Sequence, residues 1–474
     1  VVMWGFMNEI LLGIGRYIPD PNLQTATFQK TVELTERLSK VCKKTDPSRL
    51  TTIAFHGDDI YNKYRMGEFT DVVGWNLYPG WYGGNTEGFG RFVDDQHKRF
   101  PDRPLIISEY GAGSDKRINT LKPEMFDFSM QYQQKYIEDY VKQINERPFI
   151  AGSTLWLLND FGSEIRDESM PRINNKGIVT INREKKDVYF YYKAAFKKEP
   201  VIHIAVTDWP VRKITPETDN ASQIINPVKI YTNQKEIELI VNGKTLGKKS
   251  PENFVAVFDV PLLNGVNNLE AIAGNVKDVK QVRLNLQPVN YKNHKGDINI
   301  GINCGSDAYV YDPETGYTWE PDRAYKQNNG GFIGGNQYRP MKDRPGIQQE
   351  LKGTTQDPLY QTMRMGMSAY KFDVPRGQYE VELSFAEPGV KRANVLNDIG
   401  ETNFLINPDN RIFTVEINGK PVLENLNLNK EVGSLVLVKK KYIITIENEN
   451  GLTVDFKAIE GQPLLNAIKV KKTN

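Results

Sequence analysis

The sequence feature that most constrains the fold is a pair of apolar stretches, each of which ends in a glutamate. The first, at 1–4, reads Val-Val-Met-Trp and leads into Asn8 and Glu9. The second, at 104–107, reads Pro-Leu-Ile-Ile and leads through a serine into Glu109. Near-continuous apolar runs of this length are typical of strands buried on both faces of a parallel sheet. The pair therefore predicts two parallel strands that each deliver one carboxylate at the carboxyl end.

Three more apolar stretches make five strand candidates within residues 1–199, and helical patterns separate them. One helical stripe runs from Phe28 to Val41, and another runs from Tyr132 to Ile144. Strand–helix alternation predicts a parallel α/β sheet, and in (β/α) barrels the carboxyl ends of the strands form the active-site face. The expected strands are 1–7, 51–55, 71–77, 104–108 and 150–158.

Two carboxylates at one mouth suit the hydrolysis of glycosidic bonds, in which one acts as acid/base and the other as nucleophile or base. The alternative is two unrelated glutamates at strand ends. Asn8 before one glutamate and Tyr110-Gly111 after the other favour the catalytic interpretation. We expect the two carboxyl groups to lie about 5–5.5 Å apart, the spacing of enzymes that retain anomeric configuration.

These stretches resemble the motifs of a known family. Trp-Gly-Phe-Met-Asn-Glu at 4–9 resembles the acid/base motif of glycoside hydrolase family 2, and Ile-Ile-Ser-Glu-Tyr-Gly at 106–111 resembles its nucleophile motif. The resemblance covers residues 1–199 and implies strands four to eight of a (β/α)8 barrel. Because strands one to three would precede the chain, we expect a C-terminal fragment of a longer retaining exo-β-glycosidase.

The resemblance also implies roles for individual residues. Glu9 would be the general acid/base and Glu109 the nucleophile, while Asn8 would hydrogen-bond the 2-hydroxyl of the sugar. Tyr78 fits the position of a tyrosine that hydrogen-bonds the nucleophile. Trp156 resembles the tryptophan on which the sugar stacks, with core packing as the alternative.

Other side chains lie at the expected strand ends. His56 follows the second strand and is either a substrate contact or a structural residue. Asn76 ends the third strand. Trp81 lies just after Pro79-Gly80, which predicts an aromatic side chain on a loop, where its face would suit the C–H surface of a sugar. Core packing is the alternative.

The choice of sugar depends on two stretches near the end of the barrel region. Asn174 and Lys176 resemble the Asn-x-Lys pair by which β-glucuronidases grip a sugar carboxylate, but similar spacing occurs in the β-galactosidase branch. The loop 160–168 carries acidic residues, which favours substrates without a carboxylate. We therefore expect a β-galactosidase, with a β-glucuronidase as the first alternative. The second alternative is an inactive sugar-binding or structural fragment, because an unclosed sheet leaves its edges exposed.

The rest of the chain predicts two all-β domains. Alternating strands and the turn signal Asn242-Gly243 predict an immunoglobulin-like sandwich over 200–290. Residues 291–474 resemble a malectin-like carbohydrate-binding sandwich, which we expect to fold when expressed alone. Six aromatic residues in this region occupy loop-like surroundings, where they either form a sugar platform or belong to a spacer domain whose binding site has decayed: Tyr309, Tyr311, Tyr317, Trp319, Tyr338 and Tyr360.

Composition limits the classes of binding partner that we expect. The net charge is +2, from 61 basic and 59 acidic residues, which gives no electrostatic basis for binding nucleic acid or an anionic membrane. Cys42 and Cys304 are the only cysteines and fall in different expected domains, so a disulfide framework is not expected. We expect a saccharide substrate and no cofactor; no metal-ligand cluster is visible, although family members can hold a cation near the acid/base. A homo-oligomer is compatible with the sequence, and the full-length parent is expected to be periplasmic or secreted.

Overall fold

The computed structural model divides into two compact units, which are described separately below. Unit one comprises residues 2–112 and 135–158, and unit two comprises the remaining described residues. Helix α5 (Met130–Asn145) spans the division between them. The structure describes residues 2–218, 221–340, 344–389 and 410–473.

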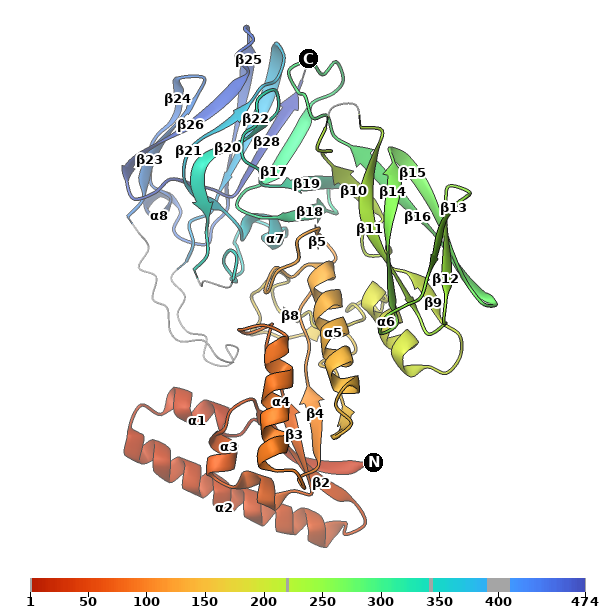
Figure 1. The fold of residues 1–474 in the computed structure, drawn as a ribbon. Helices are drawn as coiled ribbons and strands as arrows, with labels where there is room; N and C mark the ends of the chain where they lie inside the picture. Colours follow the sequence, from red (N-terminus) through yellow and green to blue (C-terminus); the bar gives the residue numbers. More distant parts are fainter. Residues whose placement is uncertain (1, 219–220, 341–343, 390–409, 474) are drawn as a thin grey trace. The chain divides into compact units, whose positions relative to one another are not determined.

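Unit one is built on a five-stranded sheet in the order β1-β2-β3-β4-β6, and every neighbouring pair is parallel (Figure 1). The five predicted strands and their parallel pairing are confirmed. The fifth prediction, 150–158, is too long, because β6 ends at Ser153 and only isolated bonds continue the pairing, such as Trp156 N to Tyr110 O at 2.9 Å. The strands are β1 Met3–Asn8, β2 Leu50–His56, β3 Val72–Asn76, β4 Leu105–Glu109 and β6 Ile150–Ser153.

Helices connect these strands. The long helix α2 packs against β1 and β2, and it begins after Asp20, whose carboxylate accepts the Asn22 N–H at 2.8 Å. Its predicted apolar face is partly wrong: Phe28 is buried, but Val41 is 58% exposed. The helices are α1 Leu12–Tyr17, α2 Pro21–Thr45, α3 Ile60–Lys63, the 3₁₀ helix η1 Met66–Phe69 and α4 Glu87–Arg99.

Unit two contains two β-sandwiches. The first, here called the middle sandwich, pairs sheet β10-β16-β15-β12-β13 with sheet β14-β11-β9 around an apolar core. The predicted Asn242-Gly243 turn is confirmed, with φ of 50° and 79°. Its strands are β9 Ile202–Ile204, β10 Val211–Ile214, β11 Gln223–Thr232, β12 Ile237–Val241, β13 Lys244–Lys249, β14 Val255–Leu263, β15 Gly265–Ala273 and β16 Val276–Leu286.

The second, here called the C-terminal sandwich, pairs sheet β25-β22-β28-β17-β19-β18-β5 with sheet β20-β21-β26-β23-β24 (Figure 1). Strand β5 comes from far upstream and pairs antiparallel with β18, Ala308 opposite Thr120. The elements are β5 Ile118–Thr120, β17 Asn299–Asn303, β18 Ala308–Asp312, β19 Tyr317–Pro321, β20 Gly330–Gln337, α7 Asp357–Tyr360, β21 Arg364–Phe372, β22 Gly377–Phe385, β23 Ile412–Ile417, β24 Lys420–Leu426, α8 Leu428–Glu431, β25 Val438–Ile446, β26 Leu452–Glu460, β27 Leu464–Leu465 and β28 Ala467–Lys472.

The loop-like surroundings expected for the six aromatic residues are wrong for five of them. Tyr309, Tyr311, Tyr317 and Trp319 lie on the paired strands β18 and β19. Tyr360 lies on helix α7 and is 2% exposed. Tyrosine and tryptophan supply large apolar surface as well as sugar-binding faces, so an aromatic-rich stretch alone does not separate the two uses.

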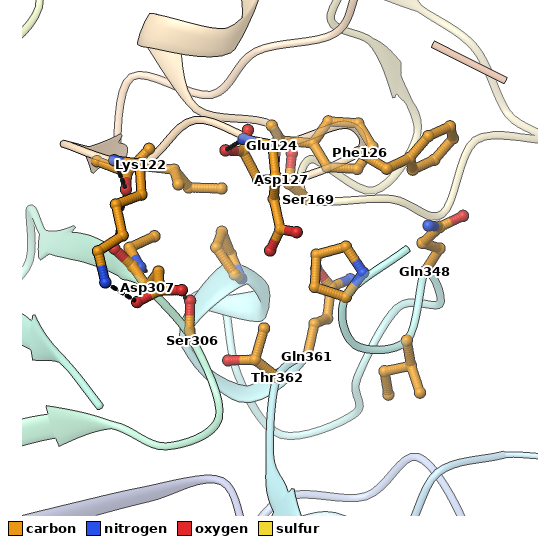
Figure 2. A pocket seen from close by; sticks show the side chains of 17 residues that line it. Lys122, Glu124, Phe126, Asp127, Ser169, Ser306, Asp307, Gln348, Gln361 and Thr362 are labelled. Carbon is orange, nitrogen blue, oxygen red and sulfur yellow. Dashed lines mark hydrogen bonds and ion pairs between the residues drawn. The ribbon is translucent and has the colours of Figure 1, made fainter. Parts of the chain in front are cut away.

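The segment that carries β5 is also held to the C-terminal sandwich by side chains. Thr120 Oγ1 donates to the Asp307 carbonyl at 2.9 Å, and Lys122 pairs with the Asp307 carboxylate at 3.3 Å (Figure 2). Glu124 accepts two hydrogen bonds from Arg339. A hollow of about 40 Å³ lies among these segments, which is room for about one water. The remaining elements of unit two are β7 Phe161–Gly162, β8 Ile173–Asn174 and α6 Asp187–Phe196.

Candidate active site

The register of the parallel sheet places three polar side chains in one row at its carboxyl edge. His56 on β2 lies opposite Asn76 on β3, and Asn76 lies opposite Glu109 on β4. Asn8 ends the neighbouring strand β1, and Glu9 follows directly. Residues separated by up to a hundred positions in the chain thus meet at one edge, as the two strand–glutamate stretches predict.

Asn76 is the hub of this row. Its side-chain N–H₂ group donates to Asn8 Oδ1 at 3.0 Å and to Glu9 Oε1 at 2.9 Å. Its Oδ1 accepts the Ser108 hydroxyl at 2.7 Å. Asn76 is 2% exposed, so these bonds fix the amide in one orientation. We call Asn8, Glu9, Asn76, Ser108 and Glu109 the strand-end cluster.

Glu9 adopts an unusual backbone conformation. Its φ is 49°, a left-handed value that non-glycine residues rarely take and that tends to occur at functional sites. Its N–H donates to the Ala54 carbonyl at 2.8 Å, which holds the conformation in place. Burial raises the pKa of the Glu9 carboxyl, and the hydrogen bond from Asn76 partly opposes that shift. A raised pKa favours the protonated form, which a general acid requires.

Glu109 is half-buried and is oriented by a tyrosine. The Tyr78 hydroxyl donates to Glu109 Oε2 at 2.8 Å, and the Leu77 N–H donates to the Glu109 carbonyl at 2.8 Å. Burial and the adjacent Glu109 raise the pKa of Tyr78 well above its ordinary value, so the phenol stays a donor. A Cβ at Gly111 would lie 2.0 Å from the Trp156 carbonyl oxygen, which explains the glycine two residues after Glu109.

The other residues expected in unit one differ in their surroundings. His56 Nδ1 lies 2.7 Å from the Tyr61 hydroxyl, so part of its role is structural. Trp156 is half-buried. Trp81 is only 1% exposed, and the expectation that its face lies open on a loop is wrong, because the loop folds its indole inward.

Asn174 and Lys176 belong to unit two, in a loop that is buried throughout. Their side chains are 5% and 3% exposed. The backbone between them is held on both sides: the Ser114 N–H donates to the Asn175 carbonyl at 3.1 Å, and Gln133 Nε2 donates to the Lys176 carbonyl at 3.3 Å. The loop is therefore a fixed element of unit two.

A buried ion pair anchors the same loop. Lys186 Nζ lies 3.3 Å from Asp160 Oδ1 and also donates to the Asn175 carbonyl at 3.2 Å. Asp160 Oδ1 accepts the Gly177 N–H at 2.8 Å, and a Cβ at Gly177 would lie 2.5 Å from that oxygen. Lys186 also donates to the Ser114 hydroxyl at 3.0 Å. We call Ser114, Asp160, Asn175, Gly177 and Lys186 the Lys186 network.

Sequence reasoning missed this network and the role of Ser108. Asp160 and Lys186 are 26 residues apart, so no helical or strand period connects them. Ser108 lies within the stretch 106–111 that resembles the nucleophile motif, but its partner Asn76 lies on another strand. Two acidic residues of loop 160–168 are ion-paired, which reduces the negative charge that the loop presents. Asp160 is paired with Lys186, and Glu168 is paired with Arg166 at 2.9 Å.

Two further observations concern the described residues. Within those ranges, no group of three or more histidine, cysteine, aspartate or glutamate side chains could hold a metal ion. None of the helices found there combines the length and the apolar character needed to cross a membrane. What the strand-end cluster offers is a pair of carboxylates, one with a raised pKa and one bonded to a tyrosine hydroxyl.

Comparison with known families agrees with this arrangement. Residues 1–200 match the model described as "Glycosyl hydrolases family 2, TIM barrel domain". The barrel-like part of the chain, residues 1–200, is therefore similar to the catalytic domain of family 2 of the glycosyl hydrolases. Residues 298–468 match a malectin domain, and residues 224–282 match a domain of unknown function, DUF4982. The resemblances inferred from the motifs are confirmed at the level of family and of the malectin-like domain.

Similar proteins extend the match over the whole chain. A solved structure of Bacteroides uniformis β-glucuronidase 2, covalently bound to cyclophellitol-6-carboxylate aziridine, is 39% identical, with a TM-score of 0.90, and covers 100% of this chain and 54% of that one. A β-glucuronidase from Bacteroides fragilis is 32% identical over 56% of this chain and 36% of its own length. The β-galactosidase BoGH2A from Bacteroides ovatus is 26% identical over 46% of this chain and 26% of its own. The chain thus spans about half or less of these relatives.

Proposed function

We propose that the protein containing this chain is a retaining exo-β-glucuronidase. The observation that carries the glycosidase assignment is the strand-end cluster, which sets Glu9 and Glu109 at the carboxyl edge of one parallel sheet. The proposal assigns residues 1–199 to the catalytic barrel, 200–290 to an immunoglobulin-like sandwich and 291–474 to a malectin-like sandwich. It includes the carboxyl separation of about 5–5.5 Å that retention requires.

In the first step Glu109 attacks the anomeric carbon while Glu9 protonates the leaving oxygen, which yields a glycosyl-enzyme ester and a free aglycone. Burial supplies Glu9 with the raised pKa for this role. The hydrogen bond from Tyr78 holds Glu109 in one position before attack. In the second step deprotonated Glu9 takes a proton from water, and that water releases the sugar from Glu109.

Asn8 is assigned to the 2-hydroxyl of the sugar. Such a contact strengthens as the transition state gains oxocarbenium character, so it contributes to rate more than to substrate binding. The amide of Asn8 accepts from Asn76 through Oδ1, which leaves its N–H₂ group as the end that can donate to a hydroxyl. Asn76 thereby orients both Asn8 and Glu9.

Glucuronide is chosen over galactoside for two reasons. The two more similar relatives described above are named β-glucuronidases, and one of them carries a covalent adduct that bears a carboxylate. The acidic loop that favoured a neutral sugar is also less repulsive than its sequence suggests, since Asp160 and Glu168 are both ion-paired. Asn174 and Lys176 are assigned to the sugar carboxylate, for which a lysine ammonium is a suitable partner.

The deciding experiment compares kcat/KM for an aryl β-glucuronide and an aryl β-galactoside in a protein with the complete barrel. We expect the glucuronide to be preferred. Lys176→Met should lower kcat/KM for the glucuronide by roughly 10- to 100-fold, the value of a hydrogen bond to a charged group. The rate on the galactoside should stay unchanged.

A preference for galactoside would overturn the choice of sugar. That outcome is the second candidate function, which the similarity to the β-galactosidase BoGH2A favours. It would leave the roles of Glu9 and Glu109 intact, because those roles do not depend on the substituent at C6. Absence of turnover on both substrates, in a folded protein with the complete barrel, would overturn the glycosidase assignment itself.

A further inference from the structure

A cavity of about 280 Å³ lies within unit two. Three stretches line it: residues 116–119, residues 208–211 at the start of the middle sandwich, and strands β18 and β19. Its volume is slightly below the roughly 300–1,000 Å³ of pockets that enclose a drug-sized molecule. It is several times larger than the hollow in Figure 2. The size suits a ligand of one sugar ring.

The walls of this cavity are aromatic. Trp209 and Tyr309 are 6% and 8% exposed, and their rings are 5.3 Å apart with a tilt of 45°. Arg212 lies 4.8 Å from the Trp209 ring, which stabilises the indole from one side. Tyr311 is 42% exposed and adds an accessible ring. Tilted aromatic rings offer the flat apolar surfaces on which the C–H faces of pyranose rings pack.

One polar atom in the wall has no partner. Asp208 Oδ2 accepts the Asp187 N–H at 2.6 Å, and the Asp208 N–H donates to Asp187 Oδ2 at 3.0 Å. Asp208 Oδ1 is buried and makes no hydrogen bond to any described residue. Buried polar atoms are almost always bonded, so this unpaired oxygen of a cavity-lining residue is available to a hydroxyl group of a ligand. Burial and Asp187 raise the pKa of Asp208, which favours a neutral hydroxyl donor.

Lys116 and Arg117, the two cations that line the cavity, are already paired with carboxylates. Arg117 pairs with Asp115 at 2.7 Å and donates to the Thr355 carbonyl at 2.7 Å. Lys116 pairs with Glu184 at 2.8 Å. An anionic ligand would have to compete with these carboxylates, whereas an uncharged polyol needs only hydrogen-bonding groups. The charge balance therefore favours a neutral ligand.

We propose that this cavity is a non-catalytic binding site for one uncharged hexopyranose unit, packed on the rings of Trp209, Tyr309 and Tyr311 and hydrogen-bonded by Asp208. The proposal concerns unit two alone. It does not depend on which sugar the strand-end cluster hydrolyses, nor on whether it hydrolyses any.

The test is saturation-transfer NMR of the full chain with methyl β-D-glucopyranoside as the probe. Val211 lines the cavity and is 41% exposed, so Val211→Trp should block the cavity without disturbing the core. Val279 lies on the same sandwich outside the cavity and is 54% exposed, which makes Val279→Trp the matched control. We expect Val211→Trp to weaken binding at least about tenfold, and Val279→Trp to leave it within about twofold.

Two further measurements keep the proposal open to refutation. Tyr311→Ala changes an exposed ring and should weaken binding about fivefold even if Val211→Trp does not fold. Equal saturation transfer for the two tryptophan variants would overturn the site. Tighter binding of methyl β-D-glucopyranosiduronate than of the neutral glucoside would overturn the uncharged ligand, because the cations would then be available to an anion.

Discussion

The strand-end cluster and the Lys186 network are both groups of hydrogen-bonded, largely buried polar side chains, but their carboxylates have different partners. Glu9 accepts a hydrogen bond from a neutral amide and makes no ion pair within the described chain. Asp160 faces a buried ammonium and a backbone N–H. Burial raises the pKa of both carboxyl groups. At Asp160 the Lys186 ammonium and the Gly177 N–H oppose that shift, whereas at Glu9 the neutral amide of Asn76 opposes it. The first arrangement suits proton transfer, and the second suits holding a loop in place.

The cluster and the network also differ in how they affect the stability of the fold. A carboxyl group that must lose and regain a proton cannot be fully paired, so a catalytic cluster gives up some stability. A buried ion pair that loses one partner leaves an uncompensated charge, so a positioning network is costly to break. Mutations in the cluster should therefore reduce the rate and leave the free energy of unfolding nearly unchanged. Mutations in the network should lower the free energy of unfolding and leave the rate nearly unchanged.

The largest expected effect is the loss of Glu109. In a protein with the complete barrel, Glu109→Ala should abolish turnover of every glycoside, by more than the roughly 10²–10⁴-fold that a lost acid–base group costs. Glu9→Ala should cost about that 10²–10⁴-fold on a natural disaccharide, and it should spare glycosylation by a dinitrophenyl glycoside, whose leaving group needs no proton. Steady-state and pre-steady-state rates on the two substrates provide the measurement.

Added azide tests the same assignment by product stereochemistry. It should restore turnover of Glu9→Ala and give the β-glycosyl azide, because azide replaces the base-assisted water. With Glu109→Ala it should give the α-anomer by direct displacement. A β-product from Glu109→Ala would mean that the two roles are reversed.

The next largest effect is a loss of stability when the Lys186 network is broken. Lys186→Met leaves Asp160 buried without its cation and should lower the free energy of unfolding by about 3–5 kcal/mol, measured by urea denaturation. Lys43→Met removes an exposed ion pair with Asp71 and should cost no more than about 1 kcal/mol. Combining Lys186→Met with Asp160→Asn should recover part of the loss. Equal effects of the two lysine variants would contradict the distinction drawn here.

A smaller effect is expected from Tyr78. Tyr78→Phe removes the hydroxyl that donates to Glu109 and should lower kcat/KM roughly tenfold, the lower end for a hydrogen bond to a carboxylate. The unfolding free energy should change little. Tyr64→Phe is the matched control, since Tyr64 stacks on Phe28 and its loss of a hydroxyl should leave the rate unaltered.

The smallest effect is a shift in pH dependence. The hydrogen bond from Asn76 lowers the pKa of Glu9 against the effect of burial, so Asn76→Leu should raise that pKa further. Activity needs protonated Glu9 and is lost as pH rises through its pKa. The basic limb of the kcat/KM profile should therefore move to higher pH. Gln96→Leu deletes another buried amide, bonded to Asn62, and should leave the limb where it is.

The sequence predicted the sheet and the position of the two glutamates because both rest on local patterns. Near-continuous apolar runs identify buried strands, and a polar residue that ends such a run must lie at the sheet edge, as Glu9 and Glu109 do. Asn76 followed from the same rule. The conformation of Trp81 did not, because the Pro-Gly pair before it marks a turn and says nothing about which way the next side chain points.

Other features depend on contacts between distant segments. The pairing of Asp160 with Lys186 leaves no periodic trace, so an acidic loop looked more repulsive than it is. The pairing of β5 with β18 joins positions almost two hundred residues apart, and a strand of three residues is too short to stand out in any pattern. These features were missed because the elements are short or their partners lie far apart in the sequence, and not because the chemistry of the residues is unusual.

The borrowed strand β5 bears on how such a protein can be rearranged over generations. A gene fusion that copied only residues 291–474 into a new host would leave the β18 edge without its partner at Ile118–Thr120, and with it the bonds to Thr120 and Lys122. Bare strand edges invite pairing with other chains. Recombination that keeps this edge of β18 covered therefore has to inherit residues 118–120 together with residues 291–474.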